Sequence, residues 1–163
     1  MPDAPAAVKK LDLTIARLRL LLADVTARAS ALEDQRRVCR DQREKLITFS
    51  MYGDSSLDSV LSMLSDVDER LAEVEATARS LMAIRKRAEN ELESLQLTKG
   101  VEEAKVLLSE LQARQAQPVG SPGALSAEEI QAEIARLQSL INEASERAAK
   151  SLRLQRSGAN PNG

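Results

Sequence analysis

The chain has 163 residues, of which 43% are hydrophobic, yet it holds one Phe, one Tyr and no Trp. Leu, Ala, Val, Ile and Met therefore supply nearly all of the apolar content, and this choice suits helix-on-helix packing better than a sheet core. The 23 basic and 25 acidic side chains leave a net charge of −2, which gives no global electrostatic reason to expect nucleic acid or an anionic membrane as a partner.

The sequence lacks the residues that most enzyme chemistry requires. It contains no histidine, which removes the commonest general base, the usual serine and cysteine triads and most transition-metal sites. No phosphate loop, dinucleotide fingerprint, calcium loop or zinc spacing occurs either. We therefore expect a protein that is not an enzyme and that uses no cofactor, metal ion or small-molecule substrate.

The one cysteine, Cys39, cannot form an internal disulfide, which fits an intracellular, reducing compartment. It occupies a core-type helical position, so a small buried thiol is favoured over a redox or nucleophilic role. The N-terminal sequence MPDAPAAVKK lacks the apolar core of a signal peptide, and the longest apolar run, Leu20 to Ala23, is too short to span a bilayer. We expect a soluble, cytoplasmic protein.

An apolar seam organises the first helix, which is expected over residues 6–48 after a flexible N-terminus at residues 1–5. Alternating steps of three and four residues place the seam on one stripe of a helix. The stripe continues through Arg36, Cys39, Arg43 and Leu46, so its second half is partly polar. The candidate core or interaction seam consists of Val8, Leu11, Ile15, Leu18, Leu22, Val25, Ala29 and Leu32.

The sequence FSMYGDSS at residues 49–56 interrupts this pattern. Gly53 supplies turn freedom, and Asp54, Ser55 and Ser56 are all good N-terminal caps for the helix that follows. That helix, expected over about residues 55–117, repeats the stripe, so the two form an antiparallel hairpin. A turn centred near Met51 would set residue i roughly opposite residue 102 minus i.

This register sets a basic run of the first helix beside an acidic run of the second. Pairing across the hairpin is favoured over the alternative, which is binding of an anionic partner. Exposed pairs of this kind contribute only about 0 to 1 kcal/mol each, so they select the register more than they stabilise it. The candidate charged patch is Arg36, Arg37, Arg40, Arg43 and Lys45, and the acids are Asp54, Asp58, Asp66, Asp68 and Glu69.

The stripe of the second helix slips near residues 98–100. Lys99 and Glu102 occupy the expected seam positions, and the apolar residues resume out of phase from Val101 to Leu111. Gly100 either ends the helix in a left-handed cap or lies inside a continuous helix with a local kink. Continuation or a slight break is favoured.

A third helix is expected over residues 126–156, after a Pro/Gly loop at residues 118–125 and before a flexible tail at residues 157–163. Ser126 and Glu129 have the spacing of a capping box at its start. The loop turns this helix back along Val101 to Leu111. The predicted fold is all-α, an elongated antiparallel helical hairpin extended to a three-helix coiled-coil bundle.

The three-helix plan resembles a spectrin-type repeat, and the hairpin resembles the core of membrane-remodelling coat proteins of the ESCRT-III and phage-shock kind. The first-helix tryptophan of the former and the leading basic amphipathic helix of the latter are absent here, so no family is assigned. The sequence favours a structural or adaptor protein that binds protein partners, either other proteins or further copies of itself, through helix packing. The alternative is a peripheral membrane coat or remodelling subunit that uses a basic helical face.

Overall fold

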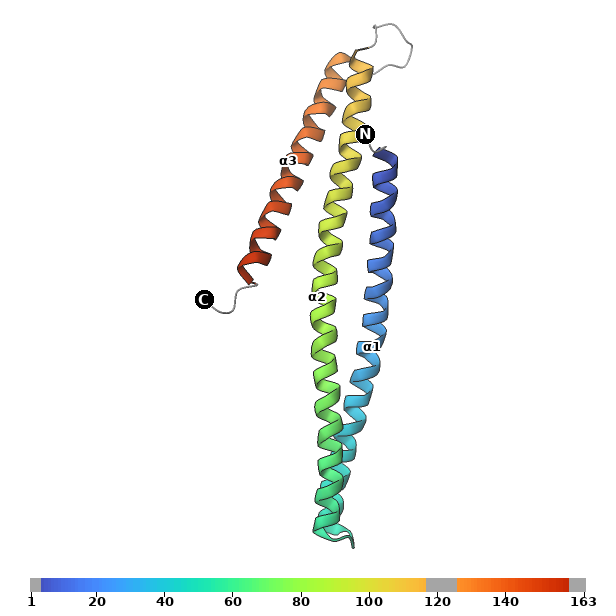
Figure 1. The fold of residues 1–163 in the computed structure, drawn as a ribbon, viewed down its shortest axis with the longest axis vertical. Coiled ribbons are helices and arrows are strands. Elements are labelled where there is room, and N and C mark those ends of the chain that lie inside the picture. The colour runs from blue at the N-terminus through green and yellow to red at the C-terminus, as the bar shows by residue number, and fades with distance from the viewer. Residues whose placement is uncertain (1–3, 117–125, 159–163) are drawn as a thin grey trace. The chain divides into compact units, whose positions relative to one another are not determined.

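The computed structural model describes residues 4–116 and 126–158. They form three helices, α1 (Ala4–Tyr52), α2 (Leu57–Gln115) and α3 (Ala127–Gly158), and this described part of the chain contains no strand (Figure 1). The predicted all-α class with three helices is confirmed. The expected N-terminus at 1–5, loop at 118–125 and tail at 157–163 lie wholly or largely outside the described residues.

The chain divides into two compact units, and α1 and α2 contribute to both. Unit 1 comprises residues 1–17 and 91–163, and unit 2 comprises residues 18–90. Unit 1 therefore includes parts of all three helices, whereas unit 2 is made of α1 and α2 alone.

The core of unit 2 is a single line of small and β-branched side chains between two antiparallel helices (Figure 1). Most of the other seam residues beside this line are half-buried, because two helices alone cannot surround a side chain. The buried residues are Val25, Cys39, Val60, Val67 and Ala88.

The turn of this hairpin comes later in the chain than the sequence pattern suggested. Helix α1 continues to Tyr52 because residues 49–52 contain no helix breaker, and the Gly53 N–H still donates to the Phe49 carbonyl at 2.7 Å. Among the three candidate caps, Ser56 starts α2: its Oγ accepts a hydrogen bond from the Ser59 N–H at 3.2 Å.

The predicted register was wrong. Arg43 Nε lies 2.9 Å from Asp68 Oδ1 and Arg36 Nε lies 3.6 Å from Glu75 Oε1, so the residue numbers of facing partners add to 111 and not to 102. The reason is the later turn, because each residue by which the centre of a turn moves along the chain changes this sum by two.

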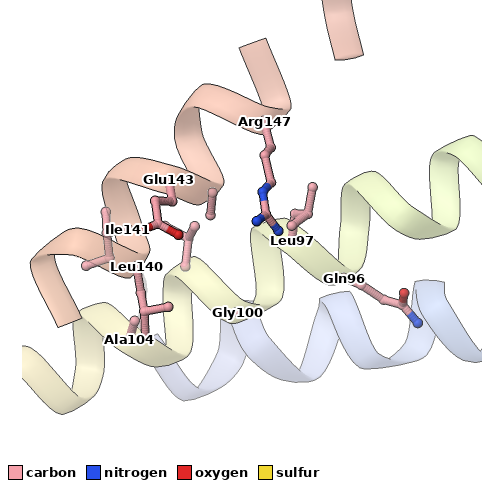
Figure 2. Close-up of a pocket in the computed structure, with 10 residues that line it drawn as sticks. Gln96, Leu97, Gly100, Ala104, Leu140, Ile141, Glu143 and Arg147 are labelled. Carbon is pink, nitrogen blue, oxygen red and sulfur yellow. The ribbon is translucent and has the colours of Figure 1, made fainter. Parts of the chain in front are cut away.

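Unit 1 is held together by a cluster between α2 and α3. Its buried members are Ala104 and Leu111 from α2 and Ile130, Ile134 and Leu137 from α3, with Leu108 and Ile141 packed against them. These α2 residues belong to the out-of-phase stripe. In Figures 1 and 2, α2 lies between the other two helices in this unit.

The slip near residues 98–100 is a change of packing partner. The in-phase residue Lys99 faces α1, where its Nζ lies 2.6 Å from Asp12 Oδ1, while the apolar residues that follow face α3. Helix α2 runs without interruption through Gly100. A helix that packs on two opposite sides needs two apolar stripes, one for each neighbour. Along α2 the more strongly apolar stripe changes from the side facing α1 to the side facing α3, and in the sequence this change looks like a phase shift.

The predicted capping box at the start of α3 is present. The Glu129 N–H donates to Ser126 Oγ at 3.2 Å, and the Ser126 N–H donates to Glu129 Oε2 at 2.9 Å. Both bonds satisfy amide groups that have no partner inside the helix. A further hydrogen bond of 2.9 Å joins Gln115 of α2 to Gln131 of α3.

Candidate interaction surfaces

The predicted seam of α1 faces the interior of the units. Ile15 and Val25 are buried, and the other members are half-buried: Val8, Leu11, Leu18, Leu22, Ala29 and Leu32. The seam residues are therefore used in packing inside the chain. Another molecule can reach them only where the half-buried side chains are partly exposed.

Cys39 is buried on the same stripe, with 7% of its surface exposed. No described residue shares a disulfide with it.

The predicted charged patch is largely used in ion pairs within the chain. Arg36 lies near Glu75 and 3.5 Å from Glu33, Arg37 lies 3.3 Å from Asp34, and Arg43 pairs with Asp68. Arg40 and Lys45 form no ion pair with any residue that the structure describes. Arg36 and Arg43 thus pair across the hairpin, Arg37 pairs within α1, and two of the five cations remain available to another molecule.

Arg36 is the one member of the patch that is half-buried, whereas the other four are exposed. Its Nε is shielded from solvent and makes no hydrogen bond, because the nearest carboxylate oxygen, on Glu75, is 3.6 Å away. The rest of the guanidinium group reaches the surface, as expected for a long side chain whose stem covers apolar neighbours.

The tip of the hairpin in unit 2 presents a group of exposed apolar side chains. It contains the only Phe and the only Tyr of the chain. Exposed fractions reach 67% for Met51 and 86% for Tyr52, so these side chains contribute little to the core. We call this group the tip cluster: Phe49, Met51, Tyr52, Leu57 and Leu61.

The backbone beneath the tip cluster is tightly packed. A Cβ atom added to Gly53 would lie 2.6 Å from both the Phe49 ring and the Phe49 carbonyl oxygen, so only glycine lets the ring fold against the turn. The ring forms one wall of a shallow hollow that Lys45, Thr48 and Tyr52 also line.

Sequence reasoning missed the tip cluster because it treated residues 49–56 only as a turn. A usable signal was present: Met51, Tyr52 and Leu61 are apolar but fall outside the spacing of the seam. The packing of the two hairpin helices buries only the stripe, so it gives no reason for a large apolar residue outside the stripe.

A second surface feature is an open groove in unit 1, between α2 and α3 (Figure 2). Gly100 lies on its α2 side, between Leu97 and Ala104, while Leu140 and Arg147 reach across from α3. A Cβ atom added to Gly100 would meet no atom within 4 Å. The lining of the groove is mostly apolar, and it also includes Gln96, Glu143 and Arg147.

The described residues show no arrangement typical of catalysis. They contain no group of three or more side chains able to hold a metal ion. Exposed ion pairs explain the clear pKa shifts: the hydrogen bond to Asp12 raises the pKa of Lys99, and pairing of Glu133 with Arg136 lowers the pKa of the carboxyl and raises that of the guanidinium.

No helix in the part of the chain that the structure describes has an apolar run sufficient to cross a membrane.

Comparison of the chain with protein-family models, with curated proteins and with solved structures gave no match. The class of the protein therefore rests on its own fold, which is all-α with three helices.

Proposed function

We propose that this protein is a non-enzymatic structural or adaptor protein, a cytoplasmic coiled-coil bundle that mediates protein–protein interaction or self-assembly as a subunit of a larger complex. The observation that carries the proposal is the tip cluster. Five large apolar residues, including both aromatic residues of the chain, are exposed within residues 49–61. Single exposed apolar residues are ordinary on protein surfaces, but a local group of this kind is typical of a docking site.

Burial of apolar surface favours the binding of a protein partner at the tip. Complete burial of one large apolar side chain contributes about 1.5–3 kcal/mol, so a partner that covers most of the tip cluster gains several kcal/mol from apolar contact. Tyr is also among the side chains that most often supply the binding energy of interfaces, and Phe is enriched in them. The Phe49 ring already lies against Gly53, so its burial costs less ordering than burial of a side chain without a neighbour.

The alternative of a membrane coat receives less support from the same surfaces. Three of the five cations in the charged patch are committed to ion pairs. The tip cluster is accompanied by the acidic residues Asp54 and Asp58, which an anionic lipid surface repels.

A photo-crosslinking experiment tests the proposal. A photoreactive amino acid replaces Tyr52 in the full chain, and a matched variant carries it at Met82, which is 71% exposed on α2 of the same unit. We expect saturable crosslinks from position 52 to a defined protein or to a second copy, and none from position 82. Equal, non-saturable labelling at both positions would contradict a docking role for the tip.

Liposome co-sedimentation at low and high salt separates the two functional classes. We expect the protein to remain in the supernatant with anionic vesicles at both salt concentrations. Pelleting that is lost at high salt, and lost when Arg40 and Lys45 are replaced by Gln, would favour the membrane coat instead.

A further inference from the structure

Acidic side chains gather around the tip cluster of unit 2. Residues 40–73 carry eight acidic and four basic side chains, a net charge of −4, whereas the whole chain carries −2. Arg43 and Asp68 within this stretch neutralise each other in an ion pair. The excess belongs to residues 54–73, where Arg70 is the only cation. Five exposed acids there form no ion pair with any residue that the structure describes: Asp54, Asp58, Asp66, Glu69 and Glu73.

The four of these acids that belong to α2 share one face of the helix. At 3.6 residues per turn they fall within about 80° of one another, on the side turned away from the buried Val60 and Val67. Leu61 of the tip cluster follows the first of them by three residues, so the two side chains are neighbours on the helix surface. The acids therefore begin beside the tip cluster and continue along α2 for about 22 Å. We call them the acidic row: Asp58, Asp66, Glu69 and Glu73.

Like charges within the acidic row repel one another in the free chain. Glu69 and Glu73 are four residues apart, and Asp66 and Glu69 are three residues apart, which are the spacings at which helical side chains interact. Arg70 forms no ion pair with either neighbour in the described structure. A cationic partner would relieve this repulsion on binding.

The α1 side of the tip does not cancel the excess. Its exposed cations Arg40 and Lys45 are matched in number by the exposed acids Asp41 and Glu44. The charge imbalance at the tip therefore comes from the face of α2 that carries the acidic row.

We infer that the tip cluster and the acidic row together bind a basic amphipathic helix of another protein. The inference rests on the proposed function, since it names the partner of the same docking site. A second copy paired through this surface, an anionic membrane or a nucleic acid would each bring further negative charge to the acidic row, whereas a basic helix brings the opposite charge.

The length and order of the surface suit a helix. About five turns of helix span the distance from Leu57 to Glu73. Large apolar residues at one end of the partner helix cover Leu57 and Leu61, which are 65% and 53% exposed, and lysine or arginine residues follow along the acidic row. Apolar burial then supplies affinity, and the charges select a basic partner and speed its association.

Fluorescence anisotropy with a designed peptide tests the partner chemistry. The probe is a labelled helical peptide of about five turns, with leucines on one face and lysines on the other, titrated with the full chain. We expect saturable binding that weakens as the salt concentration rises, and no binding of the peptide in which glutamate replaces lysine. Equal binding of the two peptides, or stronger binding of the acidic peptide, would overturn the inference.

Two matched triple variants locate the contact. Asp66→Asn, Glu69→Gln and Glu73→Gln together should raise the dissociation constant of the basic peptide about tenfold, since three exposed ion pairs of ordinary strength correspond to roughly that factor. Glu91→Gln, Glu93→Gln and Glu110→Gln remove the same charge from exposed positions of α2 in unit 1 and should change it less than twofold. Circular dichroism checks that both variants keep their helix content. Equal effects of the two variants would overturn the assignment to the acidic row.

Photo-crosslinking from position 52 separates this inference from the proposed function. We expect saturable crosslinks to a second protein that weaken in the variant of the acidic row and persist in the control variant. Crosslinks that persist equally in both variants, or that join two copies of this chain, would overturn the inference and leave the docking role of the tip intact. Non-saturable labelling of the wild-type chain would contradict the docking role itself.

Discussion

Replacement of Gly100 by alanine should stabilise the protein, although glycine at an internal helical position often signals a steric requirement. Gly100 lies well inside α2, which extends from Leu57 to Gln115. A Cβ atom at this position would meet nothing within 4 Å. The glycine therefore provides conformational freedom that the folded helix does not use, and this freedom favours the unfolded chain.

The expected gain follows from helix propensity alone. Alanine is about 0.8–1 kcal/mol more favourable than glycine inside a helix, and no packing term opposes it here. For a chain of this size a gain of that order raises Tm by roughly 2–4 °C.

Thermal and urea unfolding, followed by circular dichroism at the helix band, measure the effect. Hydrogen exchange at the amides of residues 97–104 adds a local readout, since slower exchange there shows that the gain arises in α2. The matched substitution is Gly53→Ala, whose Cβ would lie 2.6 Å from the Phe49 carbonyl oxygen. We expect it to lower the free energy of unfolding by about 1–3 kcal/mol.

An unchanged or lower stability of the Gly100→Ala variant would refute this reasoning. That result would mean that another group occupies the space above Gly100 in solution, so that α3 packs more closely on α2 there than the groove in Figure 2 indicates. Stabilisation by both glycine substitutions would refute the steric role assigned to Gly53.

Three further predictions follow from the cores and the ion pairs. Leu137→Ala should lower the free energy of unfolding of unit 1 by about 2–5 kcal/mol, measured by urea denaturation, because Leu137 is 3% exposed at the centre of the cluster between α2 and α3. Arg43→Asp should cost up to about 1 kcal/mol by juxtaposing two acids, and adding Asp68→Arg should restore most of the loss, which a double-mutant cycle quantifies. Lys99 has a pKa above 10.5, chiefly because it donates a hydrogen bond to Asp12, so its stabilising contribution is complete below pH 10.5 and is lost as the pH rises through the folded-state pKa. A side-chain NMR titration should show the Lys99 midpoint falling in an Asp12→Asn variant, and an unchanged midpoint would contradict the assigned cause.

The helices and their buried faces were predictable because they depend on local pattern. Steps of three and four residues identify the stripe that faces a neighbour, and Ile15 and Val25 are buried where that spacing places them. The capping box of Ser126 and Glu129 was equally predictable, since its partners are three residues apart and need nothing from the rest of the fold.

The surfaces were less predictable because exposure depends on residues distant in the sequence. The spacing of Val101 to Leu111 indicates a second packed face on α2, yet a kinked helix with one partner and a straight helix with two partners give the same phase shift. Leu20 and Met51 illustrate the same limit, since apolar residues become candidate contact sites only when no other element covers them.

The register error has a physical origin in the seam itself. A stripe that repeats every seven residues matches another such stripe again after each shift of about seven, so Ala29 can face the seam near Val74 or near Leu81 with similar apolar contact. Charge did not separate these arrangements, because acids follow one another along the first half of α2: Arg36 faces Asp66 in the predicted register and approaches Glu75 in the structure. The position of the turn decided between them. Residues 49–52 extend α1 by one turn of helix beyond the expected end at residue 48, and the hairpin pairs accordingly.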